Sequence, residues 1–154
     1  MKQPNTVPNG RLLIESIGLT QDRLFFFDAK LKVAIPGQLL KELLLLAAST
    51  LPFEQGFYLA TYPDIREAYE AGRITDPRAH FIEKGYLEGR VGSIPNINEE
   101  YYKSTYPDVE VAIAAGALES ALDHYVRFGA LEGRSPNLES VANTKRWLAI
   151  LGRQ

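Results

Sequence analysis

The sequence contains no cysteine, so disulfides, thiolate nucleophiles and cysteine-bound metal clusters are excluded. Its longest apolar run, residues 43–48, is far shorter than the roughly 20 residues that span a bilayer. The first ten residues, MKQPNTVPNG, have no apolar segment of the kind found in a Sec-type signal. We therefore expect neither a membrane span nor a Sec leader, as in a cytoplasmic protein or a particle assembled in the cytoplasm.

An excess of basic charge is also missing. Seventeen Lys and Arg stand against 19 Asp and Glu, with a net charge of −2 and no run of either sign. Nucleic-acid binding relies on a strong positive field, so we expect no nucleic-acid partner. The 154 residues, 45% apolar and 23% charged, fit a soluble folded protein of at most one compact unit.

Catalytic motifs are lacking as well: there is no phosphate-binding loop, dinucleotide-binding glycine motif, nucleophile elbow or H-E-x-x-H zinc motif. The only two histidines, His80 and His124, are too few to form a zinc site on their own. We predict a protein that is not an enzyme and uses neither a metal nor a cofactor.

What the chain does contain is an internal repeat. Residues 57–90 align without a gap to residues 101–134, at a constant offset of 44 and with 14 of 34 positions identical. Such a duplication is typical of stacked supersecondary units, each of which buries its apolar face against a neighbour. Proline and glycine divide each copy into three short helices, and Gly72, Gly85, Gly116 and Gly129 are predicted to stop helices in the left-handed conformation.

The repeat resembles a bacterial motif of the form Y-x-x-x-Y/N-P-D-V, then A-x-x-G, then H-Y/F-x-x-x-G-x-x-E-G-R-x-P. The matching segments include Tyr62–Ile65, Glu88–Arg90, Tyr106–Val109 and Glu132–Pro136, and they cover about half the chain. That motif occurs in or beside proteins of surface-polysaccharide biosynthesis, including glycosyltransferases, and in some large secreted proteins. The resemblance implies a link to polysaccharide, but this chain has no catalytic domain attached to its repeats.

The segments around the repeats differ from them. Alternating polar and apolar residues predict a strand over residues 24–35, paired in a hairpin with a strand over residues 11–17. A helix over residues 38–49 is leucine-rich on most of its circumference, and such a helix needs burial on all sides. We predict a mainly α fold of two stacked three-helix repeats with a small N-terminal β-hairpin and an apolar helix, in three parts: 1–52, 53–136 and a capping helix within 137–154.

Two sets of residues are candidates for binding. The N-terminal third could contact a partner or a second copy of the chain through Phe25, Phe26, Phe27, Leu39, Leu43 and Leu46. The repeats could contact a glycan through Tyr62, Asp64, His80, Glu88, Arg90, Tyr106, Asp108, His124, Glu132 and Arg134. Structural roles are favoured for the second set: the histidines bonding within their own repeats, for example to Asp64 or Asp108, and the Glu and Arg side chains bracing turns.

These observations predict a non-enzymatic interaction or assembly module of a larger bacterial or phage-like complex, linked to surface polysaccharide by the resemblance. Two alternatives stay open: a glycan-binding protein that uses the repeat surface, and an accessory part of a glycosyltransferase system. Tyrosines lining an open groove would favour glycan binding, whereas an apolar patch within residues 24–48 would favour assembly.

Overall fold

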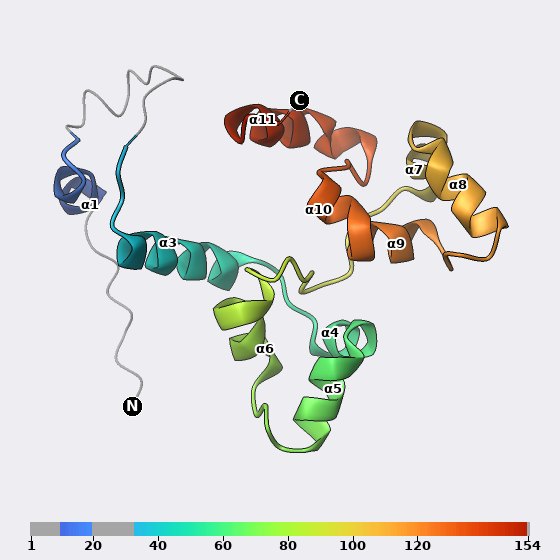
Figure 1. The fold of residues 1–154 in the computed structure, drawn as a ribbon, viewed down its shortest axis with the longest axis horizontal. Coiled ribbons are helices and arrows are strands. Elements are labelled where there is room, and N and C mark those ends of the chain that lie inside the picture. Colours follow the sequence, from blue (N-terminus) through green and yellow to red (C-terminus); the bar gives the residue numbers. More distant parts are fainter. Residues whose placement is uncertain (1–9, 20–32, 154) are drawn as a thin grey trace. The chain divides into compact units, whose positions relative to one another are not determined.

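The computed structural model describes residues 10–19 and 33–153 (Figure 1). Contacts divide the chain into two compact units, residues 1–44 and 45–154. The described residues are mainly helical and contain no β-strand. The mainly α class is therefore confirmed, and the predicted β-hairpin is wrong.

Residues proposed as the first strand of that hairpin form helix α1, Gly10–Ser16. Arg11 and Glu15, four residues apart, form an ion pair of 2.7 Å that suits a helix. Gly18 closes the helix, since its N–H donates to Glu15 and the N–H of Leu19 donates to Ile14. Of the second proposed strand, residues 24–32 and with them Phe25–Phe27 lie outside the described residues, and residues 33–35 have no regular structure.

The leucine-rich segment forms helix α3, Gly37–Thr50, as predicted. Within α3 only Ala48 is buried. The leucines of this helix are half-buried or exposed.

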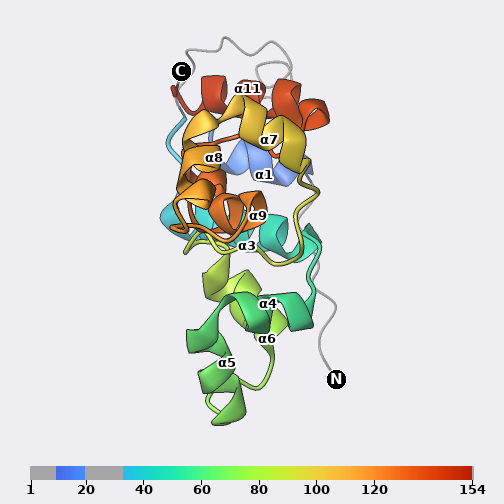
Figure 2. The same cartoon turned by 90° about the vertical axis from the view of Figure 1, so that its right-hand side faces the viewer.

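Each repeat contains the same series of elements, displaced by 44 residues. In both views the helices of each repeat lie together, α4, α5 and α6 in one group and α7, α8 and α9 in the other (Figures 1 and 2). A π-helical segment follows the third helix of each group. The first repeat comprises α4 Gln55–Thr61, α5 Pro63–Glu70, α6 Pro77–His80 and the π-helix Phe81–Gly85; the second comprises α7 Glu99–Thr105, α8 Pro107–Ala114, α9 Ala121–His124, the π-helix Tyr125–Gly129 and α10 Ala130–Glu132.

One buried tyrosine lies at the centre of each repeat. Tyr58 in α4 is fully buried and packs with Ile65 and Phe81. Tyr102 in α7 is equally buried and packs with Val109 and Ala121. Two of the three positions are equivalent in the two cores, Tyr58 with Tyr102 and Ile65 with Val109, which agrees with the predicted duplication. The third differs, because Phe81 corresponds to the half-buried Tyr125 and Ala121 to the buried Pro77.

The four glycines expected in the left-handed conformation fall into two classes. Gly72 and Gly116 have φ of 70° and 72° and end α5 and α8, as predicted. For Gly85 and Gly129 the prediction is wrong, because both close right-handed π-helices. Glycine is needed there for space: a Cβ atom at either position would collide with the Oη of Tyr58 or Tyr102.

The end of the described chain packs onto the second repeat. The 3-10 helix Leu138–Ser140 leads into α11, Val141–Ile150, the predicted last helix. Leu148 lies against Gly133 as Leu131 lies against Gly89; an added Cβ would approach the leucine Cδ2 to 2.7 and 2.6 Å respectively. Leu148 of α11 thus takes the place that a turn leucine, equivalent to Leu131, would occupy if a third repeat followed.

Candidate functional site

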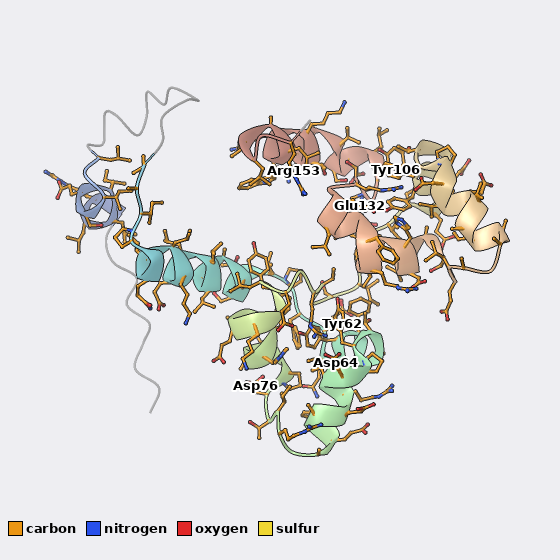
Figure 3. The ribbon with its side chains drawn as sticks, viewed as in Figure 1. Tyr62, Asp64, Asp76, Tyr106, Glu132 and Arg153 are labelled. Carbon is orange, nitrogen blue, oxygen red and sulfur yellow. The ribbon has the colours of Figure 1, made fainter. Side chains whose placement is uncertain are left out.

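Four of the candidate residues in the first repeat form one polar cluster. Arg90 donates to both carboxylate oxygens of Asp64, at 3.0 and 2.7 Å, and through Nε to Glu88 at 2.7 Å. Its guanidinium carbon lies 4.9 Å from the ring centre of Tyr62, so it also covers one face of that ring. Figure 3 labels Tyr62 and Asp64, which lie where α4 meets α5.

The second repeat reproduces this cluster. Arg134 donates to the two carboxylate oxygens of Asp108 at 2.9 and 2.8 Å and to Glu132 at 2.6 Å. It lies over the ring of Tyr106 at 4.8 Å. The agreement between repeats shows that the geometry follows from the repeated sequence and its fold.

A local backbone motif aims each arginine at its partner. Gly89 has φ of 79° and follows the last helical turn; its N–H donates to Tyr86, and that of Arg90 donates to Gly85. This is the Schellman arrangement, in which a left-handed glycine reverses the chain. Leu-Glu-Gly-Arg therefore ends a helix and sends Arg90 back to the start of α5, and Gly133 does the same for Arg134.

The tyrosine hydroxyls of the clusters hold the chain that follows each turn. Tyr62 Oη accepts the N–H of Val91 at 2.7 Å, and Tyr106 Oη accepts the N–H of Ser135 at 2.8 Å. Both bonds join residues 29 positions apart in sequence. These tyrosines therefore fasten the exit of each repeat to its first helix.

Each histidine bonds within its own repeat, as expected, but with a different partner. His80 Nδ1 lies 3.1 Å from the hydroxyl of Tyr58, and His124 Nδ1 lies 3.0 Å from that of Tyr102. The expected partners, Asp64 and Asp108, are instead held by the arginines, so that part of the prediction is wrong. A buried phenol needs a hydrogen-bond partner, and the imidazole provides it.

The pKa shifts agree with these contacts. Burial lowers the pKa of His80 and of His124, which favours the neutral imidazole. Burial also raises the pKa of both Tyr58 and Tyr102, so each phenol keeps its proton and can donate it to a neutral Nδ1.

The pKa values of the two aspartates at the helix starts are lowered, whereas burial alone would raise the pKa of a carboxyl group. Hydrogen bonds from Arg90 and Arg134 lower the pKa of Asp64 and of Asp108. The side chains of Asp64 and Asp108 are 59% and 60% exposed. We therefore expect each Arg–Asp pair to contribute no more than about 1 kcal/mol to the free energy of unfolding.

The structure thus brings eight of the ten candidate glycan-binding residues together, four in each repeat, and bonds them to one another. The other two, His80 and His124, bond instead to Tyr58 and Tyr102. The central tyrosines Tyr58 and Tyr102, identical in the two repeats, were expected in the core and were not among the candidate binding residues, so their bonds to the histidines were not predicted. Sequence reasoning also missed the reason for Gly85 and Gly129. Among residues 10–19 and 33–153, no group of three or more His, Asp or Glu side chains could hold a metal ion.

The proposed partner interface is described only in part. Leu40, Leu43 and Leu46 are 45%, 37% and 40% exposed and three residues apart, so they form a stripe along α3. Leu39, which the sequence analysis selected, is half-buried. Phe25, Phe26 and Phe27 lie outside the described residues.

No single helix among the described residues is long and apolar enough to cross a membrane. Helices α3 and α4 together have such a length and composition, but the chain bends by 111° between them. In α4, moreover, Tyr58 belongs to the core of the first repeat.

Comparisons of the chain with protein-family models, curated proteins and solved structures find no match. The resemblance of the repeat to the polysaccharide-associated motif therefore stays a prediction.

Proposed function

We propose that the chain is a non-enzymatic interaction module, which assembles into a larger bacterial or phage-like complex through its N-terminal third. The observation that supports it most is the leucine stripe of α3, with Leu40, Leu43 and Leu46 exposed on a regular helix. Burying a leucine side chain contributes roughly 1.5 to 3 kcal/mol. Several such side chains at an interface can offset the entropy lost on association.

The contacts of the repeats favour a scaffolding role over glycan binding. A sugar-binding tyrosine offers its ring face to the sugar, but in Tyr62 and Tyr106 one face is covered by an arginine. Those arginines are bound in turn by Asp64 and Asp108. The link to surface polysaccharide rests on the resemblance alone.

A substitution in the leucine stripe tests the proposal. We expect the purified chain to associate at micromolar concentration, and Leu43→Lys to release a monomer with unchanged helix content, because a charge at the interface is not tolerated. Mass by sedimentation or light scattering, with far-UV circular dichroism, measures both.

Gln38→Lys is the matched control, since it adds the same charge on another side of α3. Gln38 already bonds Glu42, four residues on, and a lysine can pair with that carboxylate. Association should persist in this variant. A wild-type chain that is monomeric, with a Leu43→Lys variant equal to it in solubility and thermal stability, would contradict the proposal.

A further inference from the structure

The outer face of α11 carries an apolar row. The inner side of this helix, with Leu148 against Gly133, packs on the second repeat. Trp147, Ile150 and Leu151 are 54%, 61% and 65% exposed. Because they are three and four residues apart, they form one continuous face. The apolar sector of α11 is thus wider than the part that contacts the second repeat.

A basic side chain borders this apolar row. At 100° per residue, Arg146 lies next to Ile150 on the side facing away from Leu148, whereas Lys145 lies on the opposite side of the helix from Trp147. Both are exposed, and within the described part of the chain neither forms an ion pair. Residues 138–153 contain three basic side chains and one acidic one, in a chain whose net charge is −2.

Arg153 ties the end of this helix to the repeat. Its guanidinium donates to the backbone carbonyl of Leu131 at 3.3 Å, and it is labelled near α11 in Figure 3. The N–H of Arg153 also donates to Leu148, which closes the helix at Gly152. The apolar row and its basic border are therefore held on a fixed helix.

We propose that α11 docks on an anionic lipid surface, with Trp147 and Ile150 entering the boundary between head groups and acyl chains. A helix that carries a basic side chain beside an exposed Trp and aliphatic row is typical of helices lying in the plane of a membrane interface. Arg146 supplies charge complementary to lipid phosphates at the edge of the row, and Lys145 adds to the positive charge of the helix. A two-fold pair of α11 helices through this row is disfavoured, because it brings the two copies of the unpaired Arg146 together.

The single tryptophan of the chain makes the proposal directly measurable, because Trp147 reports on α11 alone. We expect its emission to shift to the blue, and the full chain to float with the vesicles, when vesicles of phosphatidylcholine and phosphatidylglycerol are added. Pure phosphatidylcholine vesicles should produce neither effect. High salt should weaken binding to the anionic vesicles, because it screens the charges.

Three variants locate the contact. The double variant Lys145→Glu/Arg146→Glu and the single variant Ile150→Glu should both lose flotation. The double variant Arg66→Glu/Arg73→Glu should keep it: it changes the net charge equally, at two exposed arginines of the first repeat that form no ion pair in the described structure.

The α3 variant Leu43→Lys separates this proposal from the proposed function, since it should abolish self-association and leave both flotation and the Trp147 shift intact. Absence of a shift with anionic vesicles, an equal shift with neutral ones, or binding that survives Lys145→Glu/Arg146→Glu would overturn the lipid proposal. A shift that depends on protein concentration without vesicles would identify a second copy as the occupant, and would overturn it as well.

Discussion

The two repeats share their interior and differ in what covers it. Both bury a tyrosine at the centre and bond it to a histidine, at 3.1 Å in the first repeat and 3.0 Å in the second. In the second, the ring of Phe128 lies 5.7 Å from that of His124, which is buried. Lys84 occupies the equivalent position in the first repeat, where His80 is only half-buried.

The comparison assigns a structural role to the identical positions. Tyrosine, histidine, aspartate, glutamate and arginine recur at the same places because they bond to one another within each copy. The covering residues vary, as Lys84 and Phe128 do. Residues shared by two copies are therefore a guide to what maintains the repeat, and they need not mark a ligand site.

The largest effect is expected where the two repeats agree most closely, at Gly85 and Gly129. An alanine at either site would displace the Tyr58 or Tyr102 hydroxyl from its histidine, and we expect unfolding free energy to fall by roughly 2 to 3 kcal/mol. Gly72→Ala and Gly116→Ala are the controls: no atom lies within 4 Å of the added Cβ, and the positive φ alone should cost about 1 kcal/mol. Equal losses at all four sites in chemical denaturation would contradict the packing explanation.

An intermediate loss of folding stability is expected when the pH is lowered. The folded-state pKa of each histidine lies below 6.5, so the unfolded chain binds more protons once the pH drops below that value. Stability should be constant above about pH 6.5 and should decrease as the pH falls toward the folded-state pKa values. The aspartates, whose pKa lies below 3.8, add a separate loss in stronger acid.

Denaturation at a series of pH values measures this dependence. His80→Gln and His124→Gln should each remove part of the loss between neutral and mildly acidic pH, because glutamine can accept the tyrosine bond without titrating. A wild-type chain that becomes more stable on mild acidification would show that the histidines are charged in the folded state.

The smallest effect on stability is expected at the two residues that cover the histidines, Phe128 and Lys84. Phe128→Ala should raise the pKa of His124, since it reduces the burial that lowers it. Lys84→Ala should raise the pKa of His80 less, because burial is the larger cause there and the lysine charge a smaller one. We expect Lys84→Ala to change stability by no more than about 0.5 kcal/mol. Nuclear magnetic resonance titration of the imidazoles measures both shifts, and a larger rise for His80 would contradict the role given to Phe128.

Sequence reasoning found the repeat, the helix breaks at Pro63 and Pro107, and the leucine-rich helix α3. It failed at residues 11–17, where the apolar positions fit one face of a helix as well as one face of a strand. The ion pair of Arg11 with Glu15 and the closing glycine at position 18 both belong to a helix, so the helix is correct. Within so short a segment, apolar periodicity alone does not separate the two.

The candidate site was predicted as a set of residues but not as a set of contacts. Glu88 and Arg90 were placed at a turn and Asp64 at a helix start, and the structure joins Arg90 to both acids. The partners of the histidines were mistaken, because His80 and Tyr58 lie 22 residues apart on different helices. Only the packing of α4 against α6 brings that pair together.

By itself, the sequence determined the duplication and most helix ends, because the conformational preferences of proline and glycine are properties of the residues themselves. Gly72 and Gly116 could therefore be assigned without a structure. Tertiary structure alone decided why Gly85 and Gly129 are glycines and which face of α11 is left exposed. Both depend on atoms distant in sequence, the hydroxyls of Tyr58 and Tyr102 and the packing of Leu148 on Gly133, which approach only when the chain is folded.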